Sequence, residues 1–170
     1  MKALTISAIA ALAVLVSLTA TGASQAAEKP ARQADVATAQ ALDPDVWSDI
    51  ERDVLRLHNQ ARDNNNKPAL RGTDKLGKAA NYRCKETTRK WSHTRPNGKQ
   101  WHTVLPLFDI SYNVAGENIA RGQTSAQQVH QDWMGSSGHR GNILNGAFDF
   151  AGVGHCVSGG TTYWVVLFTG

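Results

Sequence analysis

Two histidines and one glutamate stand in separate polar motifs whose chemistry could form a metal site or an acid–base site. His93 precedes a Pro-Asn-Gly turn, Glu117 lies between a glycine and an asparagine, and His139 follows a glycine at the expected start of a helix. Loop histidines on a rigid scaffold are common at functional sites. A helix N-terminus disfavours the imidazolium, so the His139 ring is expected to be neutral, which is the form that binds metal.

Together these side chains match a catalytic zinc site, which has three protein ligands and one open position. We expect His93, Glu117 and His139 to be able to hold zinc or another divalent metal, and Glu117 is the candidate catalytic base. None of them has the His-Glu-x-x-His spacing of a zinc protease. A structural alternative stays open, in which the histidines fill polar pockets and Glu117 binds backbone N–H groups.

Two further pairs could suggest nucleophilic catalysis, but neither has the required pattern. His155 and Cys156 are adjacent in an expected strand, where neighbouring side chains point to opposite faces. Ser136 precedes His139 by three residues, but no Gly-x-Ser-x-Gly elbow surrounds it. These pairs therefore do not indicate a thiol or serine hydrolase.

Helices are expected to position the first of the polar motifs. Asp43 and the proline after it predict the start of a helix, and the apolar stripe that follows extends to about Arg62. A second helix is expected from Thr73 toward Trp91, and a short one over residues 101–108.

The later part of the chain changes from helical to strand patterns. Residues 113–123, which contain Gly-Glu-Asn, are expected to form a loop, and Thr124 is expected to cap a third helix. A short turn of helix should follow His139 and end near Leu144. Two β-branched and aromatic runs joined by a Gly-Gly turn predict an antiparallel hairpin. Helices early and strands late favour an α+β fold in which helices cover a sheet.

Residues 1–26 have the pattern of a secretory signal peptide. Lys2 gives a positive start, residues 6–18 are almost continuously apolar, and small residues follow as at a cleavage site. The apolar run is too short for a transmembrane helix, and no second run approaches that length, so we expect no membrane anchor. The protein is expected to be secreted, either extracellular or periplasmic. Residues 27–42 are polar and Ala-rich and are expected to be a flexible N-terminal segment.

The charge and the cysteine content indicate which classes of partner and which cellular compartment are compatible with the sequence. Without the signal peptide the chain has 17 basic and 14 acidic residues, a net charge of +3. This permits an anionic partner such as a cell-wall polymer or a lipid head group. No Lys/Arg run has interleaved aromatic residues, which argues against nucleic acid. Cys84 and Cys156 form an even pair in an exported chain, so we expect one disulfide, with two buried free thiols as the alternative.

The order of the motifs is more specific than any one of them. The segments are Leu57-His58-Asn59-Gln60-Ala61-Arg62, Ser92-His93-Thr94-Arg95-Pro96, Gly116-Glu117-Asn118-Ile119-Ala120, Trp133-Met134-Gly135-Ser136-Ser137-Gly138-His139-Arg140 with Asn142-Ile143-Leu144, Gly152-Val153-Gly154 and Tyr163-Trp164-Val165. In this order they resemble the CAP superfamily (cysteine-rich secretory proteins, antigen five and pathogenesis-related group one) in its bacterial secreted form. The resemblance covers about residues 50–168.

The resemblance implies a three-layer α-β-α sandwich with a small antiparallel sheet and a central cleft, over residues 43–170. The cleft of this family commonly holds two His and two Glu that can bind zinc or a similar metal. His93, His139 and Glu117 match three of these residues, and the second glutamate would fall near Ser136. We place Ser136 and Asn118 in the cleft and expect weaker metal binding, because one charged ligand is missing.

Three functions follow from these expectations. The first is a monomeric, secreted, non-enzymatic binding module that holds a divalent metal or a small lipid-like or anionic ligand, in a setting of defence or host interaction. The second is a metal-assisted, protease-like hydrolase in which Glu117 is the base and His93 and His139 hold zinc. The third is a cell-envelope interaction protein with a vestigial cleft. The missing second glutamate favours binding, because a hydrolase needs a base besides its metal ligands.

Overall fold

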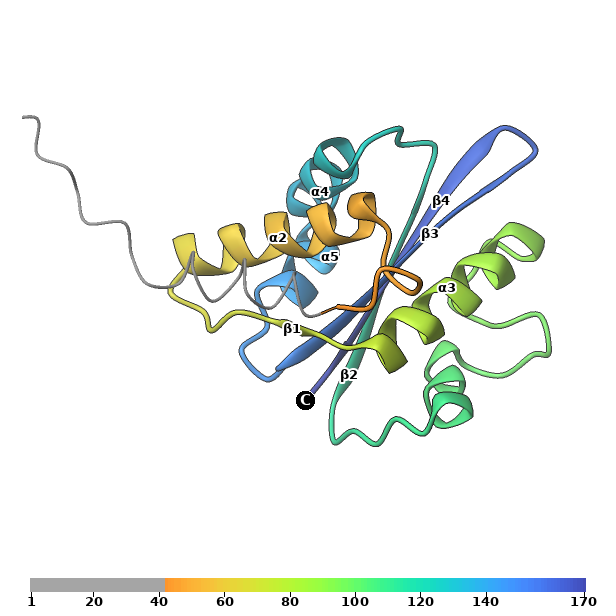
Figure 1. The fold of residues 1–170 in the computed structure, drawn as a ribbon, viewed down its shortest axis with the longest axis horizontal. Coiled ribbons are helices and arrows are strands. Elements are labelled where there is room, and N and C mark those ends of the chain that lie inside the picture. The colour runs from red at the N-terminus through yellow and green to blue at the C-terminus, as the bar shows by residue number, and fades with distance from the viewer. Residues whose placement is uncertain (1–41) are drawn as a thin grey trace, which may run out of the picture.

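A computed structural model describes residues 42–170, so the expected signal peptide and residues 27–41 of the expected flexible segment lie outside the described residues. The elements in chain order are α2 (Asp49–Asn64), β1 (Arg71–Gly72), α3 (Asp74–Arg89), η1 (Trp101–Phe108), β2 (Ala115–Arg121), α4 (Ala126–Gly135), α5 (Ser137–Ile143), β3 (Phe150–Ser158) and β4 (Thr161–Thr169) (Figure 1). None of the helices in this part of the chain is both long and apolar enough to cross a bilayer.

The first helix begins later than the sequence patterns predicted. Asp43 begins a turn instead, in which its carbonyl oxygen accepts from the N–H groups of Val46 and Trp47. α2 begins after Ser48, whose backbone N–H and hydroxyl both donate to the Glu51 carboxylate, at 2.8 and 2.7 Å. Ser-x-x-Glu is the sequence signature of a capping box, and it outweighs the signal from the proline.

The other helix boundaries agree with the patterns to within a residue or two. Thr73 caps α3 by accepting from the Leu76 N–H at 3.2 Å, as expected. α4 is capped by Ser125, which accepts from the Gln128 N–H at 3.2 Å, and not by Thr124 as predicted. η1 occupies the range expected for the short helix.

The four strands within residues 42–170 form one mixed sheet in the order β1-β3-β4-β2. β3 and β4 are the predicted hairpin, with Ser158 opposite Thr161 and two positive-φ glycines, Gly159 and Gly160, in the turn. β2 is antiparallel to β4, but β1 pairs in parallel with β3. The α+β class is therefore confirmed. The sheet was expected to be antiparallel, but its β1–β3 pair is parallel.

The expected loop over residues 113–123 is instead largely strand β2. Every residue from Ala115 to Arg121 has a partner on β4, and most of these residues are buried. Gly, Glu and Asn have low intrinsic preference for strands, so the local sequence did not indicate one. Pairing with β4, whose β-branched and aromatic run is a strong strand former, determines the conformation.

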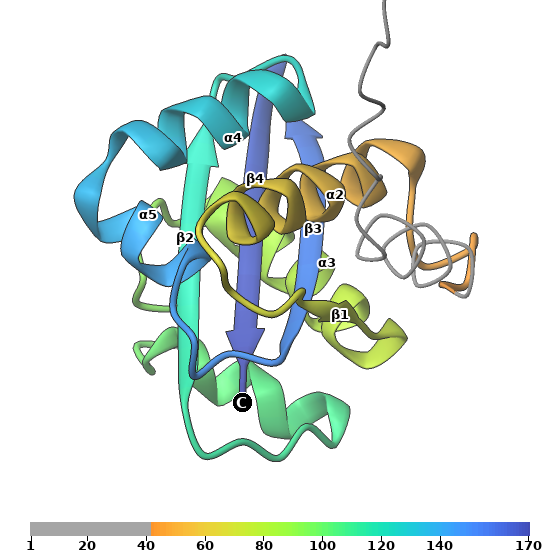
Figure 2. The same cartoon turned by 90° about the vertical axis from the view of Figure 1, so that its left-hand side faces the viewer.

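The sheet lies between two helical layers, which gives the predicted three-layer α-β-α sandwich. α3 and η1 cover one face, whereas α2, α4 and α5 cover the other (Figures 1 and 2). Val165 and Leu167 of β4 pack with Ala79 of α3, and the intervening Val166 packs with Val54 of α2. Successive residues of β4 thus point alternately into two cores.

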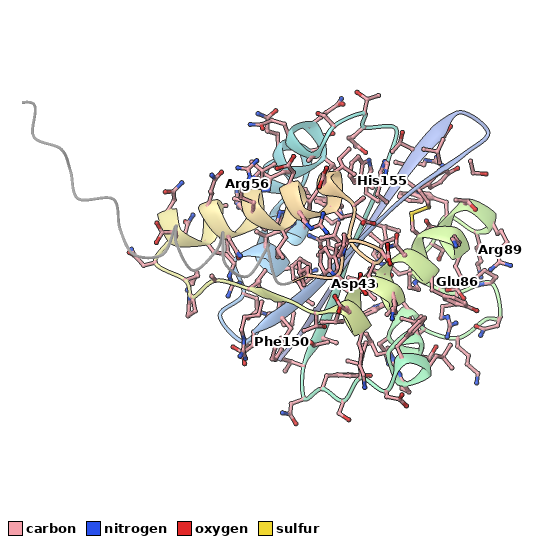
Figure 3. The ribbon with its side chains drawn as sticks, viewed as in Figure 1. Asp43, Arg56, Glu86, Arg89, Phe150 and His155 are labelled. Atoms are coloured by element: carbon pink, nitrogen blue, oxygen red, sulfur yellow. A yellow bond between two sulfur atoms is a disulfide. The ribbon has the colours of Figure 1, made fainter. Side chains whose placement is uncertain are left out.

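α3 lies unusually close to β3 because glycines replace side chains at the contact. A Cβ atom at Gly152 would overlap the backbone carbonyl of Leu76, and the glycine two residues later meets the next turn of the helix in the same way. The predicted disulfide between Cys84 and Cys156 is confirmed and joins the same two elements (Figure 3). It also removes Cys156 as a free thiol.

Arg62 fixes the end of α2 to the segment that leads into β3. Its buried guanidinium donates to the carbonyl oxygens of Pro68, Ile143, Asn145 and Phe148 at distances between 2.6 and 3.1 Å.

Candidate functional site

Glu117 lies on β2 with its side chain wholly buried against α3. Arg83 of α3 donates through Nε to Oε2 at 2.9 Å and through Nη2 to Oε1 at 3.4 Å. The Nδ1 atom of His93 lies 2.7 Å from Oε1. Both carboxylate oxygens of Glu117 are therefore bound by neighbouring side chains.

A second carboxylate extends this buried network. Arg83 donates through Nη1 to Glu86 at 2.8 Å, and Arg95 donates to Glu86 through Nε at 3.0 Å and Nη2 at 2.9 Å. Burial alone would raise the pKa of Glu86, but hydrogen bonds from Arg95 and Arg83 hold that pKa below its usual value. The network balances two guanidinium groups against two carboxylates, which burial of charge requires.

The sequence patterns did not predict Arg83 and Glu86 as site residues. Arg83 nevertheless lies on the apolar stripe of α3, directly before Cys84. A charged residue at a core-facing helix position needs a buried partner, and this was the available signal. The partner could not be identified, because Glu117 is 34 residues away on another element.

His93 lies in the loop after α3, and its side chain is 53% exposed whereas the Glu117 side chain that it contacts is 0% exposed. The Ser92 hydroxyl accepts from the Thr94 N–H at 3.0 Å, which shapes the loop around the ring. The contact with Glu117 uses Nδ1 and fixes the orientation of the ring. The Nε2 atom of His93 is left for another partner.

His139 lies in the first turn of α5, as the sequence predicted. Its Nδ1 atom is 3.0 Å from Oγ of Ser136, the residue that precedes the helix. Burial lowers the pKa of His139, and the charge of nearby His93 lowers it further. The His139 ring is therefore neutral near pH 7.

Asn118 connects the strand that carries Glu117 to the helix that carries His139. Its Nδ2 atom donates to the His139 carbonyl oxygen at 3.0 Å, and its Oδ1 atom accepts from Asn142 at 2.9 Å. The Asn118 side chain itself is fully buried. The segment that carries His139 is thus held against β2, beside Glu117, which contacts His93.

Two carbonyl groups on β2 are bound by side chains of the helical layer. The Asn142 amide donates to the Glu117 carbonyl oxygen at 3.3 Å, and the Trp133 indole donates to the Ile119 carbonyl oxygen at 3.4 Å. Alternate residues of an edge strand direct their backbone groups away from the sheet, where no strand pairs with them. Side chains of α4 and α5 take the place of that missing strand.

The structure brings the predicted cleft residues His93, Glu117, Asn118, Ser136 and His139 together around β2. Within residues 42–170 no group of three or more His, Cys, Asp and Glu side chains is placed to hold a metal ion. Arg83 already binds Glu117, so the carboxylate does not fit as a third ligand. A metal site at these residues stays a prediction, and its available donors are the Nε2 atoms of the two imidazoles.

Residues 55–168 match the model of the cysteine-rich secretory protein family, CAP, and this range contains the whole site described above. The chain belongs to the CAP family. The histidine pair at β2 thus lies within the CAP domain. Where the family resemblance implied a second glutamate, this CAP domain has Ser136, whose hydroxyl contacts His139.

The CAP domain is similar to several bacterial proteins. It is 36% identical over 129 residues to YkwD of Bacillus subtilis, in an alignment that covers 75% of this chain and 49% of YkwD. An extracellular protein containing an SCP domain from Bacillus anthracis superposes with a TM-score of 0.64 at 27% identity, over 70% of this chain and 39% of that protein. An outer surface protein of Borrelia burgdorferi shares the fold, with a TM-score of 0.64 at 23% identity over 71% of this chain and 94% of that protein. The chain thus spans about half the length, or less, of the two Bacillus relatives.

Proposed function

We propose that this CAP domain is a secreted, non-enzymatic binding module whose site at His93 and His139 holds a divalent metal or a small anionic or lipid-like ligand. The observation that carries the proposal is the burial of Glu117 between Arg83 and His93. A carboxylate bound on both oxygens orients the His93 ring. The Glu117 side chain is wholly buried, and three of its acceptor positions are already used by Arg83 and His93.

The alternative, a metal-assisted hydrolase, has less support. A general base must reach the proton that it removes and must be able to accept it. Arg83 and His93 already contact the two carboxylate oxygens of Glu117, at 2.9 and 2.7 Å, and the Glu117 side chain is wholly buried, so it is poorly placed to reach a substrate proton. A catalytic zinc site also needs three protein ligands besides the base, and Ser136 stands where a carboxylate was expected.

Glu117 and Ser136 support the two imidazoles in the same way. Each contacts an Nδ1 atom, at 2.7 Å for His93 and at 3.0 Å for His139. A hydrogen bond at one ring nitrogen fixes the tautomer and leaves the other nitrogen as a donor, which is the usual support of metal-binding histidines. Neutral imidazoles suit zinc, copper and nickel, and a carboxylate or phosphate of the ligand would supply further coordination.

The proposed secretion rests on residues 1–26, which have the charge and apolar pattern of a signal peptide. The Cys84–Cys156 disulfide supports an oxidising compartment. The similar protein from Bacillus anthracis is described as extracellular, which agrees with this location.

Isothermal titration calorimetry with zinc chloride tests the proposed site. We expect the purified protein to bind zinc, and His93→Ala and His139→Ala each to abolish this binding. His102→Ala is the matched control, because His102 contacts Tyr112 outside the site and its loss should leave zinc uptake unchanged. Identical uptake by the wild type and both site variants would contradict the proposal.

Assays with peptide, ester and glycan substrates separate binding from catalysis. We expect the wild type to show no turnover. Turnover that chelation abolishes, and that a folded Glu117→Gln variant lacks, would establish the hydrolase instead. Circular dichroism of that variant shows whether it is folded.

A further inference from the structure

The solvent-facing side of α3 carries basic residues in a regular row. Lys78, Lys85 and Arg89 are exposed and follow one another at spacings of seven and four residues, with the exposed Tyr82 between the two lysines. Residues at such spacings lie on one side of a helix. At 1.5 Å per residue, the lysine backbones are about 10 Å apart along the helix axis, and Arg89 is about 6 Å further.

These cations have no acidic partner among residues 42–170 within ion-pair distance. On α2, by contrast, Arg52 and Arg56 each pair at 3.0 Å with an aspartate three residues earlier. Glu86 lies next to Lys85 in the chain, but its carboxylate is buried and bound by arginines. The outer face of α3 therefore has unbalanced positive charge.

A hollow of about 430 Å³ lies beside this row, between α3, η1 and the turn before α2. Lys78 and Lys85 line the hollow, and Tyr82 lies between them on the same helix. The Tyr82 ring meets the Phe108 ring edge to face, with centroids 5.9 Å apart, and Val46 adds to the apolar wall. The hollow thus combines two cations with an aromatic surface.

We propose that this face of α3 binds a linear polymer in which phosphate groups join small polyol or sugar units. Successive phosphates contact Lys78, Lys85 and Arg89, whose planar guanidinium can bind a phosphate through two hydrogen bonds. A polyol or sugar unit between two phosphates enters the hollow and packs on Tyr82. This surface uses neither His93 nor His139, so it is independent of the function proposed for them.

The shape and polarity of the hollow favour a polymer over a membrane surface. Proteins that bind at a membrane interface insert a broad apolar face into the bilayer. Within η1, which lies in the described part of the chain, Leu107 is the one large apolar residue that is strongly exposed, at 61%. The walls of the hollow include Asp45, whose carboxylate suits the hydroxyl groups of a polyol or sugar.

Fluorescence anisotropy with a labelled poly(glycerol phosphate) oligomer, at about 50 and about 200 mM salt, tests the proposal. Lys78→Gln/Lys85→Gln should bind about four- to 25-fold more weakly, since each exposed charge contact contributes about two- to fivefold. The slope of log K against log salt should fall by about 1 to 2. Arg56→Gln/Lys67→Gln is the matched control. It makes the same change in net charge and should bind like the wild type. Arg56 lies in the α2 layer, away from Arg89 and α3 (Figure 3), and Lys67 is exposed in the segment after α2.

A third variant tests the aromatic wall. Tyr82→Leu should weaken binding with no change in the salt slope, because the ring contacts an uncharged unit. Three results would overturn the proposal. These are equal losses in both double variants, binding of inorganic phosphate as tight as that of the oligomer, and tighter binding to phosphatidylglycerol vesicles than to the oligomer. Zinc uptake should be the same in all α3 variants, so failure here leaves the function proposed for His93 and His139 untouched.

Discussion

Arg83 and Glu117 form an ion pair whose two side chains are both wholly buried, with Nε of Arg83 2.9 Å from Oε2 of Glu117. The pair joins α3 to β2 across one face of the sheet. Removing either partner leaves the other charge buried without compensation, which is far more costly than the pair itself is favourable. Because Glu117 also holds the His93 ring, the stability of the fold and the geometry of the site depend on the same contact.

Replacing Arg83 with methionine should therefore destabilise the protein strongly. Arg83→Met leaves Glu117 without its guanidinium partner and removes one of the two arginines that bind Glu86, so the free energy of unfolding should fall by about 3–5 kcal/mol. Urea denaturation near pH 7 measures this loss. Arg52→Gln is the control, because its exposed pair with Asp49 should contribute less than about 1 kcal/mol. Equal stabilities of the two variants would contradict this account.

Acid should destabilise the protein through a pair of histidines, of which His58 is buried and His130 is partly buried. The Nδ1 atoms of His58 and His130, on α2 and α4, lie 3.0 Å apart, so both rings cannot be protonated while this hydrogen bond exists. Burial lowers the pKa of His58 well below 6.5, and the charges of His130 and Arg62 lower it further. Burial also lowers the pKa of His130.

The sign of the pH effect follows from these directions. Both pKa values are lower in the folded than in the unfolded protein, so the unfolded state binds more protons as pH falls below about 6.5. The stability that the neutral pair contributes is fully present above that pH and is lost as pH falls toward the folded pKa values. The loss reaches at most about 1.4 kcal/mol per pH unit for each histidine.

Denaturation curves measured from about pH 8 to about pH 5 should show this decline in the wild type. His130→Gln should flatten the decline, because it removes one titrating ring and the charge that acts on His58. His102→Gln, which removes a ring that contacts Tyr112 outside the pair, should leave the pH dependence as it is. If the stability of His130→Gln fell as steeply with pH as that of the wild type, other groups would be responsible for the pH effect.

A methyl group at the contact between α3 and β3 should not be tolerated. Gly152→Ala places a Cβ atom onto the backbone of Leu76, so the helix must shift and the free energy of unfolding should fall by about 1–3 kcal/mol or more. Gly138→Ala is the matched control, because a Cβ at that helical position meets no described atom within 4 Å. It should stabilise the protein by up to about 1 kcal/mol. Thermal unfolding of both variants measures the difference.

Loss of the disulfide should weaken the attachment of α3 to β3. Cys84→Ala/Cys156→Ala should lower the free energy of unfolding by about 2–5 kcal/mol, because the bridge closes a loop with a sequence separation of 72 residues. Reductant should lower the melting temperature of the wild type and leave that of the double variant unchanged. If reductant also lowered the melting temperature of the double variant, the disulfide would not be the group on which the reductant acts.

Elements with a strong local signal could be predicted from the sequence. The cap at Thr73 and the apolar stripe after it predict α3. The two runs of β-branched and aromatic residues around a Gly-Gly turn predict the β3–β4 hairpin. The capping box of Ser48 and Glu51 also marks the start of α2, but the proline after Asp43 is a competing signal for an earlier start. β2 could not be predicted, because its strand conformation depends on pairing with a segment some 50 residues later.

The site was predictable only in part, for a related reason. The order of motifs predicts that His93, Glu117 and His139 lie close together. A motif contains no information about which other side chains, such as Arg83, contact each of these residues. Arg83 changes the chemistry of Glu117 from a potential ligand into a support for His93. Such a pairing depends on how α3 lies against β2, and no spacing within either element encodes it.

The side chains of Asn142 and Trp133 on the outer edge of β2 also affect how copies of this protein meet one another. Open sheet edges invite strands from other molecules, and this is a common start of aggregation. Here the carbonyl groups of Glu117 and Ile119 already have donors, which an incoming strand would have to displace. At high local concentration the protein is thereby protected against edge-to-edge association at this strand.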